Sequence, residues 1–123
     1  MFLQQGSRAL AAEKGAEQGA EAKGTVLNIS GRAVGSVRAD GTISNRYGKS
    51  VGSVDSGGTV YNVSNIVIGK VSDDGKVFNQ TGTLLGYVDS NGDVLNRLER
   101  KVGSVEGIED IVLMGGGARL LLF

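Results

Sequence analysis

The 123-residue sequence contains no cysteine, histidine, proline or tryptophan. Without cysteine the chain can form no disulfide, no thiolate metal site and no thiol nucleophile. Without histidine it lacks the commonest general base and the commonest metal ligand. Its 13 Lys and Arg balance 13 Asp and Glu, so no net charge attracts nucleic acid. We therefore predict that the protein is not an enzyme, holds no cofactor and binds no nucleic acid.

The sequence does contain a strict repeat of 17 residues, whose units begin at Gly24, Gly41, Gly58, Gly75 and Gly92. Each unit carries the pattern G-x-(V/I)-x-N and then (V/I/L)-G-x-V. A fixed period indicates one supersecondary unit whose copies stack and share a core. Because 17 residues fit two short strands and two tight turns, the repeat predicts an all-β domain over 24–107, formed by a continuous antiparallel meander.

One turn of each unit begins with asparagine, whose side chain can accept a hydrogen bond from the backbone two residues on. We predict a structural turn role for Asn28, Asn45, Asn62, Asn79 and Asn96. A ring of five amides could in principle hold a hard cation, but uncharged amides are poor ligands without carboxylates. The acidic turn residues match no calcium-binding loop, so we predict no metal site.

The second strand of each unit breaks its alternation, because its apolar residues lie three positions apart, as in Val34 and Val37. A glycine-hosted bulge or bend would return both to one face. The glycines that predict these bends are Gly35, Gly52, Gly69, Gly86 and Gly103. Five equal bends would curve the sheet into a closed, radial, barrel-like arrangement without exposed edges.

Four large apolar residues each follow a first-strand core position: Leu27, Tyr61, Phe78 and Leu95. Adjacent strand residues face opposite ways, so these side chains would form a stripe outside the core. We interpret the stripe as a possible interface, covered by the N-terminal arm or by another chain. The alternative is that they are ordinary scattered surface hydrophobics.

The two ends of the chain lie outside the repeat. We expect residues 1–23 to be a partly helical or disordered arm, which Phe2, Leu3 and Leu10 could anchor in an assembly. We expect 108–123 to form apolar strands at 111–114 and 120–123 that pack on the β domain, with a bend at the glycines 115–117. No signal peptide or membrane-spanning segment is predicted, which leaves the location unknown and cytoplasmic by default.

Units such as Asp40–Val54 and Ser90–Val105 resemble the repeats of the five-fold β-flower proteins, a small bacterial family without a known function. The resemblance covers 24–107 and implies a radial all-β arrangement of hairpins. It brings no catalytic or ligand-binding residue. Asn65 and Glu99 stand where other units have a turn glycine, and since Glu tolerates a left-handed backbone poorly, we expect the fifth turn to deviate.

The leading functional prediction is a structural or protein-interaction scaffold, with a homo-oligomer or a protein partner. The alternative is a small-molecule or glycan-binding module that uses turn amides with Tyr47, Tyr61 and Tyr87. An enzymatic function would require carboxylates such as Asp73, Asp74 and Glu99 to converge.

Overall fold

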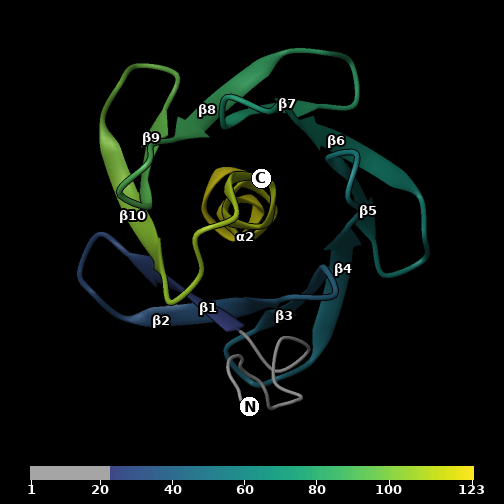
Figure 1. Ribbon diagram of the computed structural model, residues 1–123, viewed down its shortest axis with the longest axis horizontal. Helices are drawn as coiled ribbons and strands as arrows, with labels where there is room; N and C mark the ends of the chain where they lie inside the picture. The colour runs from purple at the N-terminus through teal and green to yellow at the C-terminus, as the bar shows by residue number, and fades with distance from the viewer. Residues whose placement is uncertain (1–22) are drawn as a thin grey trace, which may run out of the picture.

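A computed structural model describes residues 23–123 as a ring of strands around a central helix (Figure 1). The expectations for the N-terminal arm, including Phe2, Leu3 and Leu10, lie outside the described residues.

Ten strands form the ring, and each is antiparallel to both of its neighbours. They are β1 (Lys23–Asn28), β2 (Ala33–Arg38), β3 (Thr42–Asn45), β4 (Ser50–Val54), β5 (Thr59–Asn62), β6 (Val67–Val71), β7 (Lys76–Asn79), β8 (Leu84–Val88), β9 (Asp93–Asn96) and β10 (Lys101–Glu106). The order is an up-and-down meander, and β1 pairs with β10 to close it. Closure removes the free edges that an open sheet would expose. The predicted closed, radial all-β fold is confirmed.

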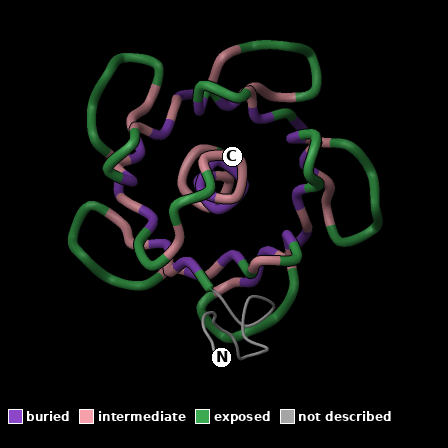
Figure 2. Tube along the Cα trace, viewed as in Figure 1, coloured by how far each residue is buried: buried purple, intermediate pink, exposed green. Residues whose placement is uncertain are grey.

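Two sets of loops connect the strands. The hairpin tips, residues 29–32, 46–49, 63–66, 80–83 and 97–100, lie within each repeat and project outward in Figure 1. The connecting turns, residues 39–41, 55–58, 72–75 and 89–92, join one repeat to the next and lie on the inner ring. Figure 2 shows the tips as exposed loops outside a largely buried ring.

The inner face of the ring is a belt of ten β-branched residues, nine valines and Ile43, which we call the valine belt. They form five cross-strand pairs: Val26 with Val105, Val37 with Ile43, Val54 with Val60, Val71 with Val77, and Val88 with Val94. Each of these side chains is buried. Such pairs suit a pleated surface, and here they form the outer shell of the core.

A bulge interrupts the second strand of every repeat, but the glycine is not the inserted residue. Val26 pairs with Gly35 and Leu27 with Ala33, so Val34 is the extra residue. The other four repeats skip the residue before the glycine in the same way, at Val51, Ile68, Leu85 and Val102. The bulge lies directly beside the predicted glycine, and a bend at the glycine itself stays a prediction.

The glycine of each bulge serves close packing instead. A Cβ at Gly35 would overlap the carbonyl oxygen of Ser44 on the neighbouring strand, and Gly52, Gly69, Gly86 and Gly103 face equivalent carbonyls. Glycine therefore allows the neighbouring backbone to approach where the sheet bends most.

The C-terminal segment is a helix, so the predicted strands at 111–114 and 120–123 are wrong. Helix α2 (Ile111–Leu122) lies on the axis of the ring, where all sides of it face the sheet (Figure 1). A strand in this position could not pair, because the closed sheet offers no free edge. A helix satisfies its backbone groups internally, and Asp110 caps its start by accepting hydrogen bonds from the N–H groups of Val112 and Leu113, at 2.9 and 3.2 Å.

The three consecutive glycines are part of this helix and not a bend. A Cβ at Gly115 would overlap Val71, and one at Gly116 would overlap Val54. At Gly117 a Cβ would lie 3.0 Å from a methyl group of Val26. These residues bring the helix backbone directly against the valine belt, which offsets the poor helix propensity of glycine by packing.

The fifth hairpin tip keeps the geometry of the others, contrary to the expectation that it deviates. Glu99 adopts a positive φ of 65°, as does Asn65, while the glycines at the equivalent positions have φ between 82° and 87°. The N–H of Glu99 donates to the carbonyl of Asn96 at 2.8 Å, matching the 2.9 Å bond from Gly31 to Asn28. The hydrogen-bonded turn imposes this conformation on a residue that disfavours it.

Candidate functional site

The barrel has two different ends, which the direction of α2 identifies. Helix α2 begins among the connecting turns, where Ile111 lies against Gly75 and Met114 near Gly92. It ends at the level of the bulge glycines, where Leu120 contacts Gly35 and Phe123 contacts Gly69. The hairpin tips are at this second end, since the Asn96–Leu98 region shares a cavity with the last turn of α2.

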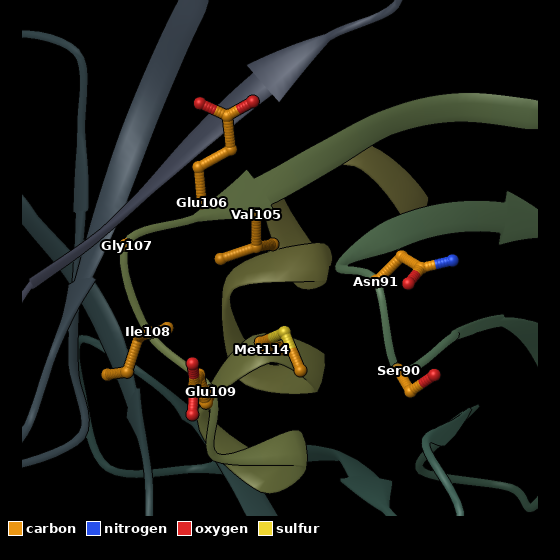
Figure 3. Close-up of a pocket in the computed structure, with 8 residues that line it drawn as sticks. All are labelled: Ser90, Asn91, Val105, Glu106, Gly107, Ile108, Glu109 and Met114. Carbon is orange, nitrogen blue, oxygen red and sulfur yellow. The ribbon is translucent and has the colours of Figure 1, made fainter.

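A cavity lies at the connecting-turn end, where the chain leaves β10 for α2. It has a volume of about 690 Å³ and a floor formed by Val105, Ile108 and Met114. Figure 3 shows Met114 between the turn at Ser90 on one side and the segment at Ile108 on the other. Glu106 and Glu109 also line it, together with Ser90 and Asn91 of a connecting turn.

The connecting turns carry five of the ten acidic side chains among residues 23–123. In these turns Asp55 Oδ1 accepts hydrogen bonds from the N–H groups of Gly57 and Thr59, at 3.0 and 2.9 Å. The bond from Thr59 is the main reason why the pKa of Asp55 falls below the usual 3.8. A backbone bond from Thr42 lowers the pKa of Asp40 in the same way. These carboxylates are therefore ionised caps that stabilise turns.

The three carboxylates named for an enzymatic function do not lie together. Asp73 and Asp74 lie in a connecting turn, and Glu99 lies in a hairpin tip at the opposite end of the barrel. Within residues 23–123, no group of three or more Asp or Glu side chains is arranged to hold a metal ion. In the same part of the chain, no helix is long and apolar enough to cross a membrane.

The five asparagines at the hairpin tips make the same hydrogen bonds in each repeat. Asn28 Oδ1 accepts from the N–H groups of Ser30 and Arg32, at 2.9 and 3.1 Å. The side chains of Asn45, Asn62, Asn79 and Asn96 accept from residues two and four positions on in the same way. Each amide oxygen is thus engaged with its own turn, and each tip is held in one conformation.

The hairpin-tip end carries the exposed apolar side chains of the molecule. All the exposed large hydrophobics among residues 23–123 lie here: Ile29, Tyr47, Val63, Ile66, Val67, Leu98 and Phe123. Tyr47 is 79% exposed and Leu98 70% exposed, so neither contributes to the core. Burial against the barrel does not explain these residues.

Three of the five tips, 29–32, 46–49 and 97–100, are basic. Five cationic side chains lie in them, namely Arg32, Arg46, Lys49, Arg97 and Arg100, and Glu99 is their single acid. The guanidinium of Arg46 lies 5.1 Å from the centre of the Tyr47 ring, a cation–π contact within one tip. The molecule is therefore polarised along its axis, with basic, apolar tips at one end and acidic turns at the other.

The predicted outer stripe is less exposed than this end. Leu27, Tyr61, Phe78 and Leu95 are half-buried on the wall of the barrel, and Ser44 at the equivalent position is buried. The hydroxyl of Tyr61 donates to Asp55 Oδ2 at 3.1 Å, so part of this stripe is engaged within the chain. An interface at the stripe stays a prediction.

The three tyrosines of the alternative small-molecule prediction do not meet. Tyr47 lies in the tip between β3 and β4, Tyr61 on β5 and Tyr87 on β8. No cavity described above contains two of them. A ring-shaped ligand site formed by tyrosines and turn amides therefore lacks support from their placement.

Sequence reasoning missed the hairpin tips as a surface because it treated them only as turns. The available signal was the residue type within the turn, where polar or small residues are usual. An apolar or aromatic residue lies one or two positions after the turn asparagine in four repeats, at Ile29, Tyr47, Val63 and Leu98.

Comparison with known families gives one finding. The sequence model of the family described as 5-fold beta-flower protein matches residues 7–115. This range contains all ten strands and the start of α2. No curated protein and no solved structure matches the chain.

Proposed function

The chain belongs to the 5-fold beta-flower family, and we propose that it is an interaction scaffold that presents its hairpin tips to a partner surface. Family membership indicates a small structural fold, and that fold is not a known enzyme class.

The filled interior supports a function on the outside of the barrel. The valine belt surrounds α2, and Gly115 and Gly116 lie so close to it that a single methyl group would not fit. A ligand on the barrel axis would have to displace the helix and the core together.

The observation that carries the proposal is the gathering of exposed apolar side chains at the tips. Ile29, Val63 and Leu98 are each at least 63% exposed, on three different hairpins. Exposed apolar residues concentrated on one part of a surface mark interaction sites. The hydrogen-bonded asparagine turns hold these tips rigidly, which lowers the entropic cost of binding.

A site-specific photo-crosslinking amino acid tests this function. It would replace Leu98 or Tyr47 at the tips and, as a control, Lys70 on the exposed face of β6. We expect specific adducts, identified by mass spectrometry after irradiation in cells, from the two tip positions and not from Lys70. Equal labelling from all three positions, or none from the tips, would contradict the proposal.

A homo-oligomer is one partner that this experiment would detect, as a crosslinked dimer. The apolar C-terminal segment packs against the core inside the barrel as α2. Self-association would have to use the tips or the half-buried stripe, and it stays a prediction.

A further inference from the structure

We propose that the hairpin-tip end docks on an anionic lipid surface, with the apolar tip side chains entering the headgroup region and the basic side chains contacting lipid phosphates and carboxylates. This inference rests on the proposed function, because it names the class of partner that the tips meet.

The side chains of the tips have the chemistry of residues found at membrane interfaces. Four of the five tips carry exposed apolar or aromatic side chains, and Tyr47 is 79% exposed and lies beside Arg46. Amphipathic tyrosine and long basic side chains favour the membrane interface, where the ring and the aliphatic stem are in an apolar layer and the charge is hydrated. Tips of this kind suit shallow insertion and not spanning.

Charge is distributed unevenly along the barrel axis. Three of the five tips are positively charged through Arg32, Arg46, Lys49, Arg97 and Arg100, and Glu99 offsets this charge only in part. The connecting turns at the other end are acidic. An anionic surface would therefore attract the side of the tip end formed by these three tips and repel the opposite, connecting-turn end.

The tips have a common position along the barrel axis. The same register, bulge position and turn hydrogen bonds recur in each repeat, so the tips lie at one height along the barrel axis. They form a wide ring of separate points around the barrel in Figure 1. A protein interface needs a continuous, closely packed apolar centre, whereas separated points of equal height fit a flat fluid surface.

A second copy of the chain fits this end less well. Its complementary charges are in the connecting turns, which lie on the inner ring of Figure 1 and not at the radius of the tips. Coaxial stacking would place those acidic turns against the mouth of the barrel, away from the basic side chains that they would need to contact.

Vesicle flotation with the full chain tests the inference. We expect binding to vesicles that contain phosphatidylserine and not to vesicles of phosphatidylcholine alone, with weaker binding as salt is added. The variant Arg97→Gln/Arg100→Gln should bind about 25-fold more weakly, since each basic residue near the surface contributes about fivefold. The matched control Lys70→Gln/Lys76→Gln removes the same charge away from the tips and should bind within about twofold of the original chain.

The apolar contribution needs its own variant. Ile29→Ser/Leu98→Ser changes two exposed side chains, so the fold should survive, as a thermal melt would verify. We expect the affinity for the vesicles to fall by up to about tenfold, because less apolar area enters the interface. The charge variant keeps the test valid if this one fails to fold.

Three outcomes would overturn the inference: no binding to phosphatidylserine vesicles, equal losses in the tip and control charge variants, or no loss in the apolar variant. If the vesicles fail while Leu98 and Tyr47 crosslink specifically to a protein, the lipid inference is wrong and the proposed function stands. If the tips crosslink to nothing in cells, the proposed function itself fails.

Discussion

The substitution Gly115→Ala distinguishes packing of α2 inside the barrel from helix propensity alone. In a solvated helix this change stabilises by about 1 kcal/mol. Here the new methyl group would overlap Cγ1 of Val71 and lie 2.9 Å from its Cγ2. Overpacking of a filled core costs about 1–3 kcal/mol, and the overlap with two methyl groups of a buried, β-branched residue favours the upper value. The expected net effect is destabilisation by about 2 kcal/mol.

Thermal and urea unfolding would measure this effect, which corresponds to a Tm lower by roughly 10 °C for a domain of this size. Gly117→Ala is the matched control, because the nearest atom to its Cβ is 3.0 Å away, and it should cost less. Val71→Ala should relieve the clash, since the nearest remaining atom of residue 71 is its Cβ, at 3.2 Å. The double variant should then be no less stable than Val71→Ala alone. A more stable Gly115→Ala, or simple additivity in the double variant, would refute the reasoning.

Further predictions concern the turns and pH. Glu99→Gly should stabilise the fold by up to about 1 kcal/mol, because glycine adopts the left-handed backbone without strain. Gly48→Ala should destabilise it by about 1 kcal/mol, because the Cβ has open space but the φ is 82°. A lower Tm for Glu99→Gly would contradict this prediction. Asn79→Ala should destabilise the fold by about 1 kcal/mol, because the N–H groups of Thr81 and Thr83 lose their acceptor. Asn79→Asp keeps an acceptor oxygen and should retain most of the stability. Equal chemical denaturation midpoints for the two variants would count against the hydrogen-bonding role. The folded-state pKa values of Asp40 and Asp55 lie below the usual 3.8. The contribution of these carboxylates to the stability of the fold is therefore complete above that pH and is lost as the pH falls below it. A Tm that stays constant through this pH range would contradict the prediction.

The fold of the repeats could be predicted from the sequence because its determinants are local. Asparagine and glycine fix each turn, and the spacing of Val34 and Val37 indicates a bulge within one strand. Closure follows because the same bend recurs at equal intervals. The sequence does not reveal that Val34 is the residue without a partner at the bulge, nor that the carbonyl of Ser44 approaches Gly35.

The C-terminal helix could not be predicted in the same way. Ile111–Met114 has the β-branched content of a strand, and Gly115 and the two glycines after it lower helix propensity. Its conformation depends on the closed sheet around it, which offers no edge for pairing and requires small residues at the contact with the valine belt. That environment is formed by residues far away in the sequence.

The candidate site lies between these cases. The sequence indicates the turns that form the hairpin tips, and it contains the apolar residues at Ile29 and Leu98. It does not show that the tips share one end of the barrel, because this depends on the common register of all repeats. The half-buried state of the stripe at Tyr61 and Phe78 also depends on packing that a single repeat does not reveal.

The most direct test of the account is a nuclear Overhauser measurement between α2 and the valine belt in the labelled full chain. The account predicts cross-peaks from the methyl groups of Val71 to Gly115 and from those of Val54 to Gly116, together with helical Cα shifts over 111–122. Extended-strand shifts over this segment, or the absence of both sets of cross-peaks in an otherwise folded barrel, would contradict a helix at the centre of the ring.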